Sequence, residues 1–402
     1  MSSSSTETCT IFISMASYRD PLCLNTLQSL FEMADHPDRV FVGICQQNDR
    51  SIDTDCLSIH HDQELFDMWV KNHVRMIRLS HKDARGPTFA RYFCSLLYQN
   101  EDYFFQIDSH SLFVRHWDTH SIHMIKTLEP YYPRPILSHY CDMYDNYEQY
   151  KENVPDGYHV TTNMGAGVDG NGIPYLLGAK YLPPLSYPRH SIFISGQMFF
   201  APGIFVKEVP FDPHLEDLFF GEEMILTVRA FTHGYDVFTP TRPIIFHAYT
   251  REKEPKYWTD RSISQHNAQQ KVFYLLHMKD TPNDVNVNVN SNVNVNSNLK
   301  EWDQFGNGNV RSVDAFYEWT GIQRPWKEPV SVRQEIFDLP LISYDKWQYC
   351  QKCPVKKNFP TIPWSSSSYG VWKLVLLLFF IFLIVTSLHY FLFSKRYSHK
   401  IP

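Results

Sequence analysis

Short apolar segments alternate with helical patterns between residues 10 and 110, and this alternation constrains the fold of the chain more than any other feature. Four segments have the apolar content of buried strands: Thr10–Ser14, Val40–Cys45, Val74–Leu79 and Tyr103–Ile107. Apolar residues at helical spacing lie between them: Leu24, Leu27, Leu30 and Phe31, and later the run Phe89–Leu97 that follows Pro87. Strands that alternate with helices predict an α/β fold with a mostly parallel sheet and helices on both faces.

Polar residues follow three of these predicted strands at the point where each strand ends. They are Ser17–Asp20, Gln46–Asp49 and Asp108–His110. In a parallel sheet of this kind, ligands bind outside the carboxyl ends of the strands. We therefore expect these three segments to build one ligand site.

The segment Tyr103–His110 carries the most specific of these signals, because aromatic and aliphatic residues run directly into Asp108-Ser-His110. Side chains two positions apart on a strand point to the same face, so Asp108 and His110 can bind the same ion. A carboxylate oxygen and an imidazole nitrogen suit Mn²⁺ better than Ca²⁺. The alternative interpretation is a polar turn after a strand, with His110 in solvent.

Composition excludes some classes of function. The chain has 402 residues, enough to bury one large core or two smaller ones, and a net charge of −6. Lys and Arg are scattered rather than gathered in a basic stripe, so nucleic acid is not an expected partner. The eight cysteines are dispersed, and those in apolar surroundings, such as Cys45 and Cys94, are interpreted as core residues rather than as a disulfide framework. Cys350 and Cys353 form a lone CxxC without the second pair of a zinc site.

A long apolar segment near the C-terminus predicts a membrane anchor. Leu374–Phe393 has the length of about 20 residues that matches the hydrocarbon thickness of a bilayer. The N-terminus lacks the pattern of a signal peptide, and the sequence contains no Asn-x-Ser/Thr sequon. These features predict a single-pass C-terminal anchor, with the preceding domain in the cytosol.

The chain is expected to divide into five parts. They are a disordered N-terminus (1–9), the main domain (10–325), a stalk (326–370), a transmembrane helix (371–393) and a short tail (394–402). Within the main domain, Asp142–Pro188 is rich in Tyr, Pro and Gly, which is typical of a loop that shapes a binding rim. Residues 284–298 are an Asn/Val repeat, interpreted as a low-complexity insertion. Further strand and helix patterns cover Ile192–Ala201, Met224–Phe231, Val237–Pro240 and Ile244–Tyr249.

Several segments together resemble a family of GlcNAc-transferases that attach α-linked N-acetylglucosamine to hydroxyproline of a cytosolic protein or to Thr of mucin-like surface proteins. The matching segments are Ser14–Pro21, Ala84–Arg91, Gln106–His110, Ser195–Gln197, Phe220–Glu223 with Arg229 and Ala230, Phe246–Tyr249, and Arg311–Ile322. The Asp-Ser-His block is also similar to that of mucin-type polypeptide GalNAc-transferases. The resemblance covers residues 10–325. It implies a GT-A-like nucleotide-diphosphosugar transferase fold, which is a mostly parallel mixed sheet flanked by helices.

This resemblance implies a glycosyltransferase, specifically a hexosyltransferase, that transfers GlcNAc from UDP-GlcNAc to a protein hydroxyl with retention of configuration. The expected acceptor is hydroxyproline, Thr or Ser, and a glycan is an alternative. The implied cofactor is Mn²⁺ or another divalent cation, which would act as a Lewis acid on the departing UDP. Its ligands would be Asp108, His110 and, as in related transferases, His247. A core or surface histidine is the alternative for His247.

Residues near the strand ends are the candidates for binding the nucleotide. Arg85 and Arg91 are candidates for the uridine and diphosphate, because guanidinium groups suit phosphate geometry. Either arginine could instead be a surface charge on a helix. The other candidates are Ser17, Arg19 and Asp20 after the first strand, Gln47 after the second, and Asp108 after the fourth.

Glu222 and Glu223 precede a predicted helix and are the candidate catalytic carboxylates. In an inverting enzyme one of them would be the general base. With retention, the leaving phosphate would assist a front-face attack, and Glu222 would orient groups and stabilise charge. Either residue could instead only stabilise the helix dipole. The rival interpretations of the whole chain are an inactive sugar- or protein-binding member of the same fold, a metal-dependent hydrolase, and a membrane tether that docks a protein.

Overall fold

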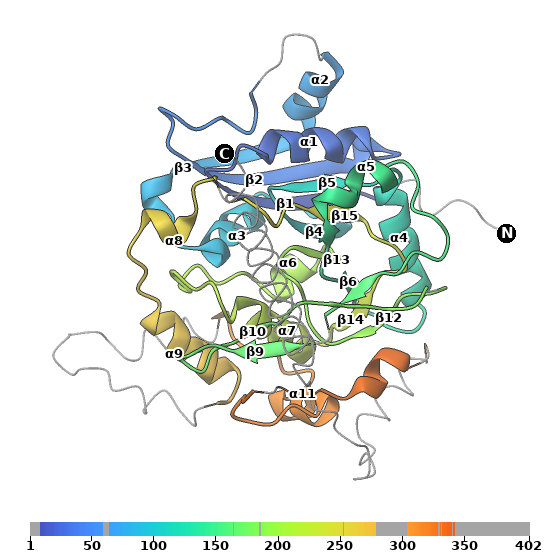
Figure 1. The fold of residues 1–402 in the computed structure, drawn as a ribbon, viewed down its shortest axis with the longest axis vertical. Helices are drawn as coiled ribbons and strands as arrows, with labels where there is room; N and C mark the ends of the chain where they lie inside the picture. Colours follow the sequence, from blue (N-terminus) through green and yellow to red (C-terminus); the bar gives the residue numbers. More distant parts are fainter. Residues whose placement is uncertain are drawn as a thin grey trace, which may run out of the picture. The chain divides into compact units, whose positions relative to one another are not determined.

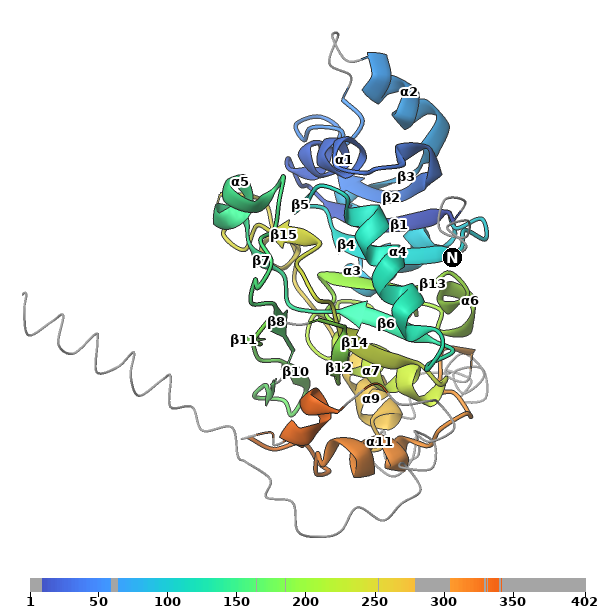
Figure 2. The same cartoon turned by 90° about the vertical axis from the view of Figure 1, so that its right-hand side faces the viewer.

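The computed structural model describes residues 9–58, 64–163, 165–184, 186–251, 253–278, 304–328, 330, 332–339 and 341. They contain an eight-stranded sheet with helices packed on both faces (Figure 1). Its strands are β1 (Ile11–Tyr18), β2 (Val40–Asn48), β3 (Val74–Ser80), β4 (Tyr103–Asp108), β6 (Pro135–Ser138), β12 (Arg189–Ser191), β13 (Met198–Pro202) and β14 (Asp236–Thr239). The strand order is β12-β14-β6-β13-β4-β1-β2-β3, and Figure 2 shows the strands following one another in that order.

The shorter elements surround this sheet. The helices are α1 (Cys23–Glu32), α2 (Glu64–His73), α3 (Pro87–Ser95), α4 (Trp117–Leu128), α5 (Tyr147–Tyr150), α6 (Phe205–Glu208), α7 (Glu222–Thr232), α8 (Tyr257–Asp260), α9 (His266–Leu275) and α11 (Val313–Thr320), with 3₁₀ turns η1 (Pro37–Arg39), η2 (His81–Asp83), η3 (Tyr144–Asn146) and η5 (Gln334–Asp338). The small sheets pair β8 (Thr161–Thr162) with β11 (Lys180–Tyr181), β9 (Ala166–Val168) with β10 (Pro174–Leu176), and β15 (Ile245–His247) with both β5 (Ser111–Phe113) and β7 (Asp142–Met143).

The first four strands of the sheet confirm the predicted parallel arrangement. β1 pairs in parallel with β2 and β4, and β2 pairs in parallel with β3. This register places Tyr18 opposite Gln47 and Ala16 opposite Asp108, so the carboxyl ends of three strands meet. β13 is antiparallel to both β4 and β6, which makes the whole sheet mixed.

The alternation of side chains along β1 explains why helices cover both faces. Ile11, Ile13 and Met15 pack in one buried cluster with residues of α1 and α4. Phe12 points to the opposite face, because successive strand residues alternate, and packs with residues of α6 and α7. Each fully buried side chain of this kind contributes about 1.5–3 kcal/mol to stability. The sheet is therefore a rigid platform for the loops at its carboxyl edge.

The predicted strand Ile192–Ala201 is interrupted in the structure. β12 ends at Ser191 and β13 begins at Met198, with a turn between them. The carbonyl oxygen of Gly196 in this turn accepts hydrogen bonds from Arg91 Nη2 at 3.0 Å and from Gln106 Nε2 at 2.7 Å. These contacts to other segments take the place of strand pairing, and the apolar pattern did not reveal them.

The packed chain extends past residue 325, where the sequence predicts a stalk. Trp326, Val332, Ile336 and Phe337 are each at most 3% exposed, and they pack in one cluster with residues of α7, α9 and α11. This segment is therefore held by apolar burial against the main domain. Residues 342–370 of the predicted stalk, the Asn/Val repeat and residues 394–402 lie outside the described residues.

The predicted membrane helix requires a correction. Across the part of the chain that the structure describes, no helix is long and apolar enough to cross a membrane. The longest of the helices given above, α4, has 12 residues, whereas a spanning helix needs about 20. The predicted span 371–393 itself lies outside the described residues. The fold class that the described residues show is a mixed α/β fold, and among them the predicted C-terminal transmembrane helix, with the membrane location that depends on it, finds no support.

The cysteines are also partly different from the prediction. Cys45, Cys94 and Cys141 are buried, as expected of core residues. Cys23 and Cys56 form a disulfide, which the sequence analysis did not predict. The parallel pairing of β1 with β2 brings the loops after both strands together, and this long-range contact places the two cysteines 5.2 Å apart at their Cα atoms.

Candidate active site

A cavity of about 440 Å³ lies at the carboxyl ends of β1, β2 and β4. Its lining includes Ala16, Gln47 and Asp108 from these strand ends, His247 from β15, and Glu222 from the start of α7. Such an edge is where open α/β sheets bind ligands. The expectation of one site built from the polar ends of these strands matches the position of this cavity.

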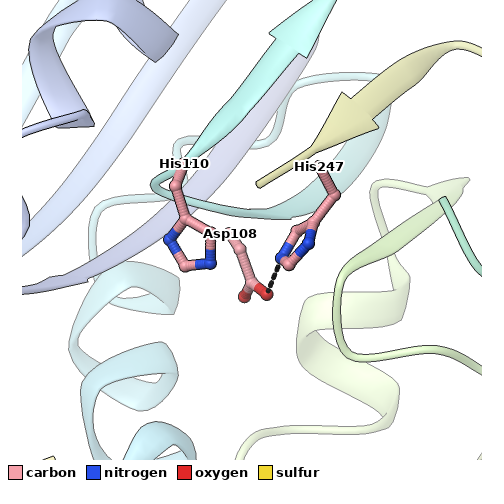
Figure 3. A group of neighbouring side chains, drawn as sticks. All are labelled: Asp108, His110 and His247. Atoms are coloured by element: carbon pink, nitrogen blue, oxygen red, sulfur yellow. Dashed lines mark hydrogen bonds and ion pairs between the residues drawn. The ribbon is translucent and has the colours of Figure 1, made fainter. Parts of the chain in front are cut away.

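Asp108, His110 and His247 form a metal-capable cluster in the cavity. One ligand atom from each side chain lies within 4.8 Å of the others, and the two imidazole rings are 4.6 Å apart at their centroids. Figure 3 shows the rings on either side of the Asp108 carboxylate. His247 Nε2 lies 3.1 Å from Asp108 Oδ2. The pairing of β15 with β5 places His247 opposite Ser111, next to His110. This long-range pairing assembles the cluster.

The protonation of the cluster suits a divalent cation. Burial alone would raise the pKa of Asp108, but the hydrogen bond with His247 and the nearby charges of His110 and Arg91 hold that pKa below its ordinary value. Burial lowers the pKa of His247, against the opposite effect of Asp108. An ionised carboxylate and a neutral imidazole are the forms that bind metal ions.

Asp20 contacts the Nδ1 side of the His110 ring and orients it. Its Oδ2 accepts a hydrogen bond from Ser109 Oγ at 2.6 Å and lies 2.8 Å from His110 Nδ1. The Asp20 side chain is 1% exposed, so it has little surface left for a nucleotide. A carboxylate that binds one imidazole nitrogen and leaves the other for a metal is a common partner of metal-binding histidines. Asp20 thus lies against His110 and also belongs to the lining of the cavity.

Arg91 links the cluster to the predicted catalytic carboxylates. Its Nη1 donates to Glu222, and its Nη2 lies 3.3 Å from Asp108 Oδ1. Burial alone would lower the pKa of Arg91, but Glu222 and Asp108 raise it above its ordinary value, so the guanidinium stays charged. Glu222 also accepts a hydrogen bond from Thr88 Oγ1 at 2.8 Å. Both carboxylate oxygens of Glu222 are therefore engaged.

Glu223 differs from its neighbour in charge state. Its Oε1 accepts a hydrogen bond from the backbone N–H of Gly196 at 2.6 Å. Burial, with a further contribution from the negative charge of Glu222, raises the pKa of Glu223 to about 8. At neutral pH the side chain is therefore mainly a neutral acid that can donate a proton in a hydrogen bond.

Three further nucleotide candidates, Gln47, Ser17 and Arg19, differ in whether they line the cavity. Gln47 lines the cavity and is 3% exposed, and its Oε1 has no hydrogen-bond partner among the described residues. Ser17 is fully buried next to Cys56, with 3.6 Å between Oγ and Sγ. Arg19 pairs with Asp53 and with Asp260, at 2.8 Å in each case. Of this group, only Gln47 contributes to the lining of the cavity among residues that the structure describes.

Arg85 lies outside the described lining of the cavity. Its side chain is 53% exposed and pairs with Glu216, itself 50% exposed. The guanidinium also lies 5.4 Å from the centroid of the Phe89 ring. Arg85 is therefore a surface charge, which is the alternative given for it above, whereas Arg91 is buried.

Arg251 is a cavity residue that the sequence analysis missed. Its side chain is 16% exposed, and Nη2 lies 3.4 Å from Asp20 Oδ1. Its Nε is buried and has no hydrogen-bond partner among the described residues. The only available signal was its position four residues after His247, just beyond the segment Phe246–Tyr249 that carries the family resemblance.

The fold and the site define an α/β protein with a deep ligand cavity at the carboxyl edge of its sheet and a metal-capable Asp–His–His cluster inside it. Residues 10–66 and 58–325 match the family described as Glycosyltransferase (GlcNAc). This match covers most of the sequence, so the chain belongs to the GlcNAc glycosyltransferase family. The predicted glycosyltransferase class is thereby confirmed.

Two solved structures are similar to part of the chain. A crystal structure of GalNAc-T7 with UDP, GalNAc and Mn²⁺ has 13% sequence identity and a TM-score of 0.49, and the similarity covers 78% of this chain and 56% of that one. A crystal structure of S. aureus TarS 1–349 in complex with UDP-GlcNAc has 10% identity and a TM-score of 0.39, covering 74% and 71%. The chain therefore spans little more than half of the GalNAc-T7 chain. No curated protein matches the chain.

Proposed function

We propose that this glycosyltransferase transfers GlcNAc from UDP-GlcNAc to a hydroxyl group of a polypeptide, with a divalent cation such as Mn²⁺ and with retention of configuration. The acceptor residue would be hydroxyproline, Thr or Ser. The observation that carries the proposal is the cluster of Asp108, His110 and His247 inside a cavity at the carboxyl edge of the sheet. Membership of the GlcNAc glycosyltransferase family supports the donor sugar.

The side chains present fit a resident cation. One carboxylate and two imidazoles are a donor set that suits Mn²⁺ and related ions. The Nδ1 atom of His247 has no hydrogen-bond partner among the described residues. The Nε2 atom of the same ring contacts Asp108. When bound by this cluster, a divalent cation would stabilise the negative charge that develops on the departing diphosphate.

Arginine and glutamine side chains supply the other contacts that a nucleotide diphosphate needs. Arg251 presents a buried, positively charged group next to the cluster, which suits a phosphate oxygen. Gln47 offers a buried amide at the end of β2, where the uracil or ribose would accept or donate hydrogen bonds. We assign Arg251 to the diphosphate and Gln47 to the nucleoside.

The two glutamates favour a reaction without a protein base. Glu222 is poorly placed to act as a general base, because Arg91 and Thr88 donate hydrogen bonds to its two oxygens. Glu223 is also a poor general base, because its raised pKa leaves it mainly protonated at neutral pH. The acceptor proton would then pass to the leaving phosphate, which accompanies attack on the same face of the sugar and retention. In this scheme Glu222 holds Arg91 in position, and Glu223 donates a hydrogen bond to the sugar or the acceptor.

Release of UDP from a panel of UDP-sugars tests the proposal without knowledge of the acceptor, because transferases also pass the sugar slowly to water. The full chain is assayed with Mn²⁺ and with EDTA, alongside Asp108→Asn. We expect UDP-GlcNAc to be hydrolysed fastest. Chelation or the substitution should lower the rate by about 10²–10³-fold, the usual loss when stabilisation of developing charge is removed.

The control for this test is Asp145→Asn, which removes an exposed carboxylate outside the cavity lining and should leave hydrolysis unchanged. Silence with every UDP-sugar, together with no cation-dependent UDP binding, would contradict the enzyme and favour a binding member of the same fold. Once an acceptor is found, the anomeric configuration of the product tests retention directly, and a β-linked product would contradict the roles given to the two glutamates.

A further inference from the structure

Four aromatic side chains line the cavity in an unbroken series, which we name the aromatic strip. Its members are Tyr175, Phe220, Phe219 and Trp258. The ring centroids are 4.8 Å apart between Tyr175 and Phe220, 5.2 Å between Phe220 and Phe219, and 4.9 Å between Phe219 and Trp258. The rings come from β10, from the segment before α7 and from α8, so the fold gathers them from three separate parts of the chain.

Three of these rings are exposed: Phe219 by 47%, Phe220 by 40% and Trp258 by 48%. Single exposed apolar side chains are ordinary, but a contiguous exposed group of this kind marks a binding surface. The same cavity also contains Asp108 and His247 of the metal-capable cluster. The strip is therefore continuous with the proposed donor site, which is the position that a second substrate must occupy.

The backbone around the strip is held in place by hydrogen bonds centred on Asp217. Its backbone N–H donates to the carbonyl oxygen of Arg85 at 2.9 Å, and its Oδ2 accepts from the backbone N–H of Ser264 at 3.0 Å. Tyr257 Oη donates to Asp217 Oδ1. These contacts tie α8 to the segment that carries Phe219, so the strip is preorganised rather than formed on binding.

Gly221 connects the strip to the catalytic centre. It has a φ of +92°, and a Cβ at this position would lie 2.9 Å from Cγ2 of Ile173, so both conformation and space favour glycine here. Phe220 precedes it on the strip, and Glu222 follows it with its ion pair to Arg91. A molecule that contacts Phe220 therefore lies next to the segment that carries Glu222.

We infer that the aromatic strip binds the acceptor, and that the acceptor is an extended polypeptide with apolar side chains next to the modified hydroxyl. This inference rests on the proposed function. A glycan carries hydroxyl groups around each ring, and each buried hydroxyl needs a polar partner. Of the four rings of the strip, only Tyr175 and Trp258 carry a polar atom, so the strip offers few partners for such hydroxyls, whereas apolar side chains bury well against aromatic rings. Alternate side chains of an extended peptide lie about 7 Å apart, so two of them reach the strip together.

The test uses the full chain, UDP-GlcNAc, Mn²⁺ and a panel of synthetic peptides with one central Thr, Ser or hydroxyproline. The flanking positions are Val, Leu and Phe in one half of the panel and Ser, Glu and Lys in the other half. Methyl glycosides form the glycan arm. We expect transfer to peptides with apolar flanks to exceed transfer to those with polar flanks by at least tenfold.

Phe219→Ala and Trp258→Ala supply the second measurement. For each variant the KM for the best peptide and the ratio of transfer to hydrolysis are determined. We expect the KM to rise and the ratio to fall, each by at least tenfold, because the strip contacts the acceptor and not the donor. The matched control is Tyr131→Ala, an exposed aromatic residue outside the cavity lining, which should keep the wild-type ratio.

Three results would overturn the inference while the cation-dependent use of UDP-GlcNAc as a donor stands. They are hydrolysis of UDP-GlcNAc without transfer to any peptide, transfer to methyl glycosides that depends on Phe219, and transfer to peptides that is indifferent to the flanking residues and to both variants. Absence of hydrolysis by the wild-type chain is a different outcome, since it contradicts the use of UDP-GlcNAc as a donor.

Discussion

The cavity has two surfaces that differ in how their side chains are held. On the charged surface, Arg91 and His247 have side chains only 9% and 6% exposed, and both contact Asp108. On the aromatic strip, Phe219 and Trp258 are nearly half exposed and meet each other edge to face. Charged groups must be fixed before the substrate arrives if they are to stabilise developing charge. An apolar strip needs only shape, so it can serve a longer and more variable partner.

The charged surface should also be the more costly one to disturb, and Arg91→Gln is the largest expected effect. This change leaves Asp108 and Glu222 without their shared cation in a mostly buried position. Removal of one partner from a buried ion pair typically costs about 3–5 kcal/mol. We expect a loss of this size in the free energy of unfolding, measured by urea denaturation in EDTA.

Arg85→Gln is the matched control, because Arg85 also pairs with a glutamate but both side chains are about half exposed. Exposed ion pairs are worth about 0–1 kcal/mol, so this variant should unfold almost as the wild type does. Equal losses for the two variants would show that the charged surface is not held more tightly than the outer surface of the domain.

Glu223→Gln should change how stability depends on pH. Burial raises the pKa of Glu223 from 4.5 to about 8, so between these pH values the folded chain binds a proton that the unfolded chain has released. The free energy of unfolding therefore falls as pH rises through this range. Glutamine cannot ionise, and it keeps an oxygen for the N–H of Gly196. We expect the variant to gain on the order of 4 kcal/mol over the wild type between pH 4.5 and pH 9.

This measurement is made in EDTA, so that the Glu223 carboxyl is compared without a cation nearby. The exposed Glu148→Gln, which also replaces a glutamate by glutamine, serves as the control. A difference between Glu223→Gln and the wild type that stays constant with pH would show that Glu223 is ionised in the folded chain. In that case Glu223 would be available as a general base, and the argument for retention would lose one of its two supports.

The sequence predicted those parts of the molecule that depend on local patterns. The apolar segments before Asp20 and Asp108 indicate strands, and their alternation with helices fixes the parallel arrangement of the first four strands. The two-residue spacing of Asp108 and His110 is likewise a local property. His247 could be named only through the family resemblance, because the pairing of β15 with β5 joins segments more than a hundred residues apart.

The features that the sequence did not reveal depend on contacts between distant segments. The break in the strand predicted at Ile192–Ala201 exists because Arg91 and Gln106 bind the carbonyl oxygen of Gly196. Arg251 lines the cavity beside Asp20, and no spacing in the sequence predicts that contact. The aromatic strip is likewise drawn from segments that are not adjacent in sequence.

Asp20→Asn separates the role given by the structure from the one expected from the sequence. If Asp20 orients His110, the variant should bind Mn²⁺ about 10–100-fold more weakly, which is the usual cost of losing such a partner. Its affinity for UDP in EDTA should be unchanged. Calorimetric titrations with Mn²⁺ and with UDP measure the two quantities. The control is Asp53→Asn, which changes a carboxylate outside the cavity lining that pairs with Arg19 and accepts a hydrogen bond from the backbone N–H of Asp49. Weaker UDP binding in EDTA with normal Mn²⁺ binding would favour the nucleotide-binding role expected from the sequence.

The smallest expected effect is on the stability of the strip itself. Phe219→Ala and Trp258→Ala remove rings that are already about half exposed, so each should change the free energy of unfolding by no more than about 1 kcal/mol. Phe105→Ala, which empties a fully buried position on β4, should cost about 3–5 kcal/mol in the same urea experiment. A loss of that size from Phe219→Ala would mean that the ring supports the fold, so its exposure would no longer indicate a binding surface. A small loss leaves substrate binding as the reason for keeping large apolar rings at the edge of a charged cavity.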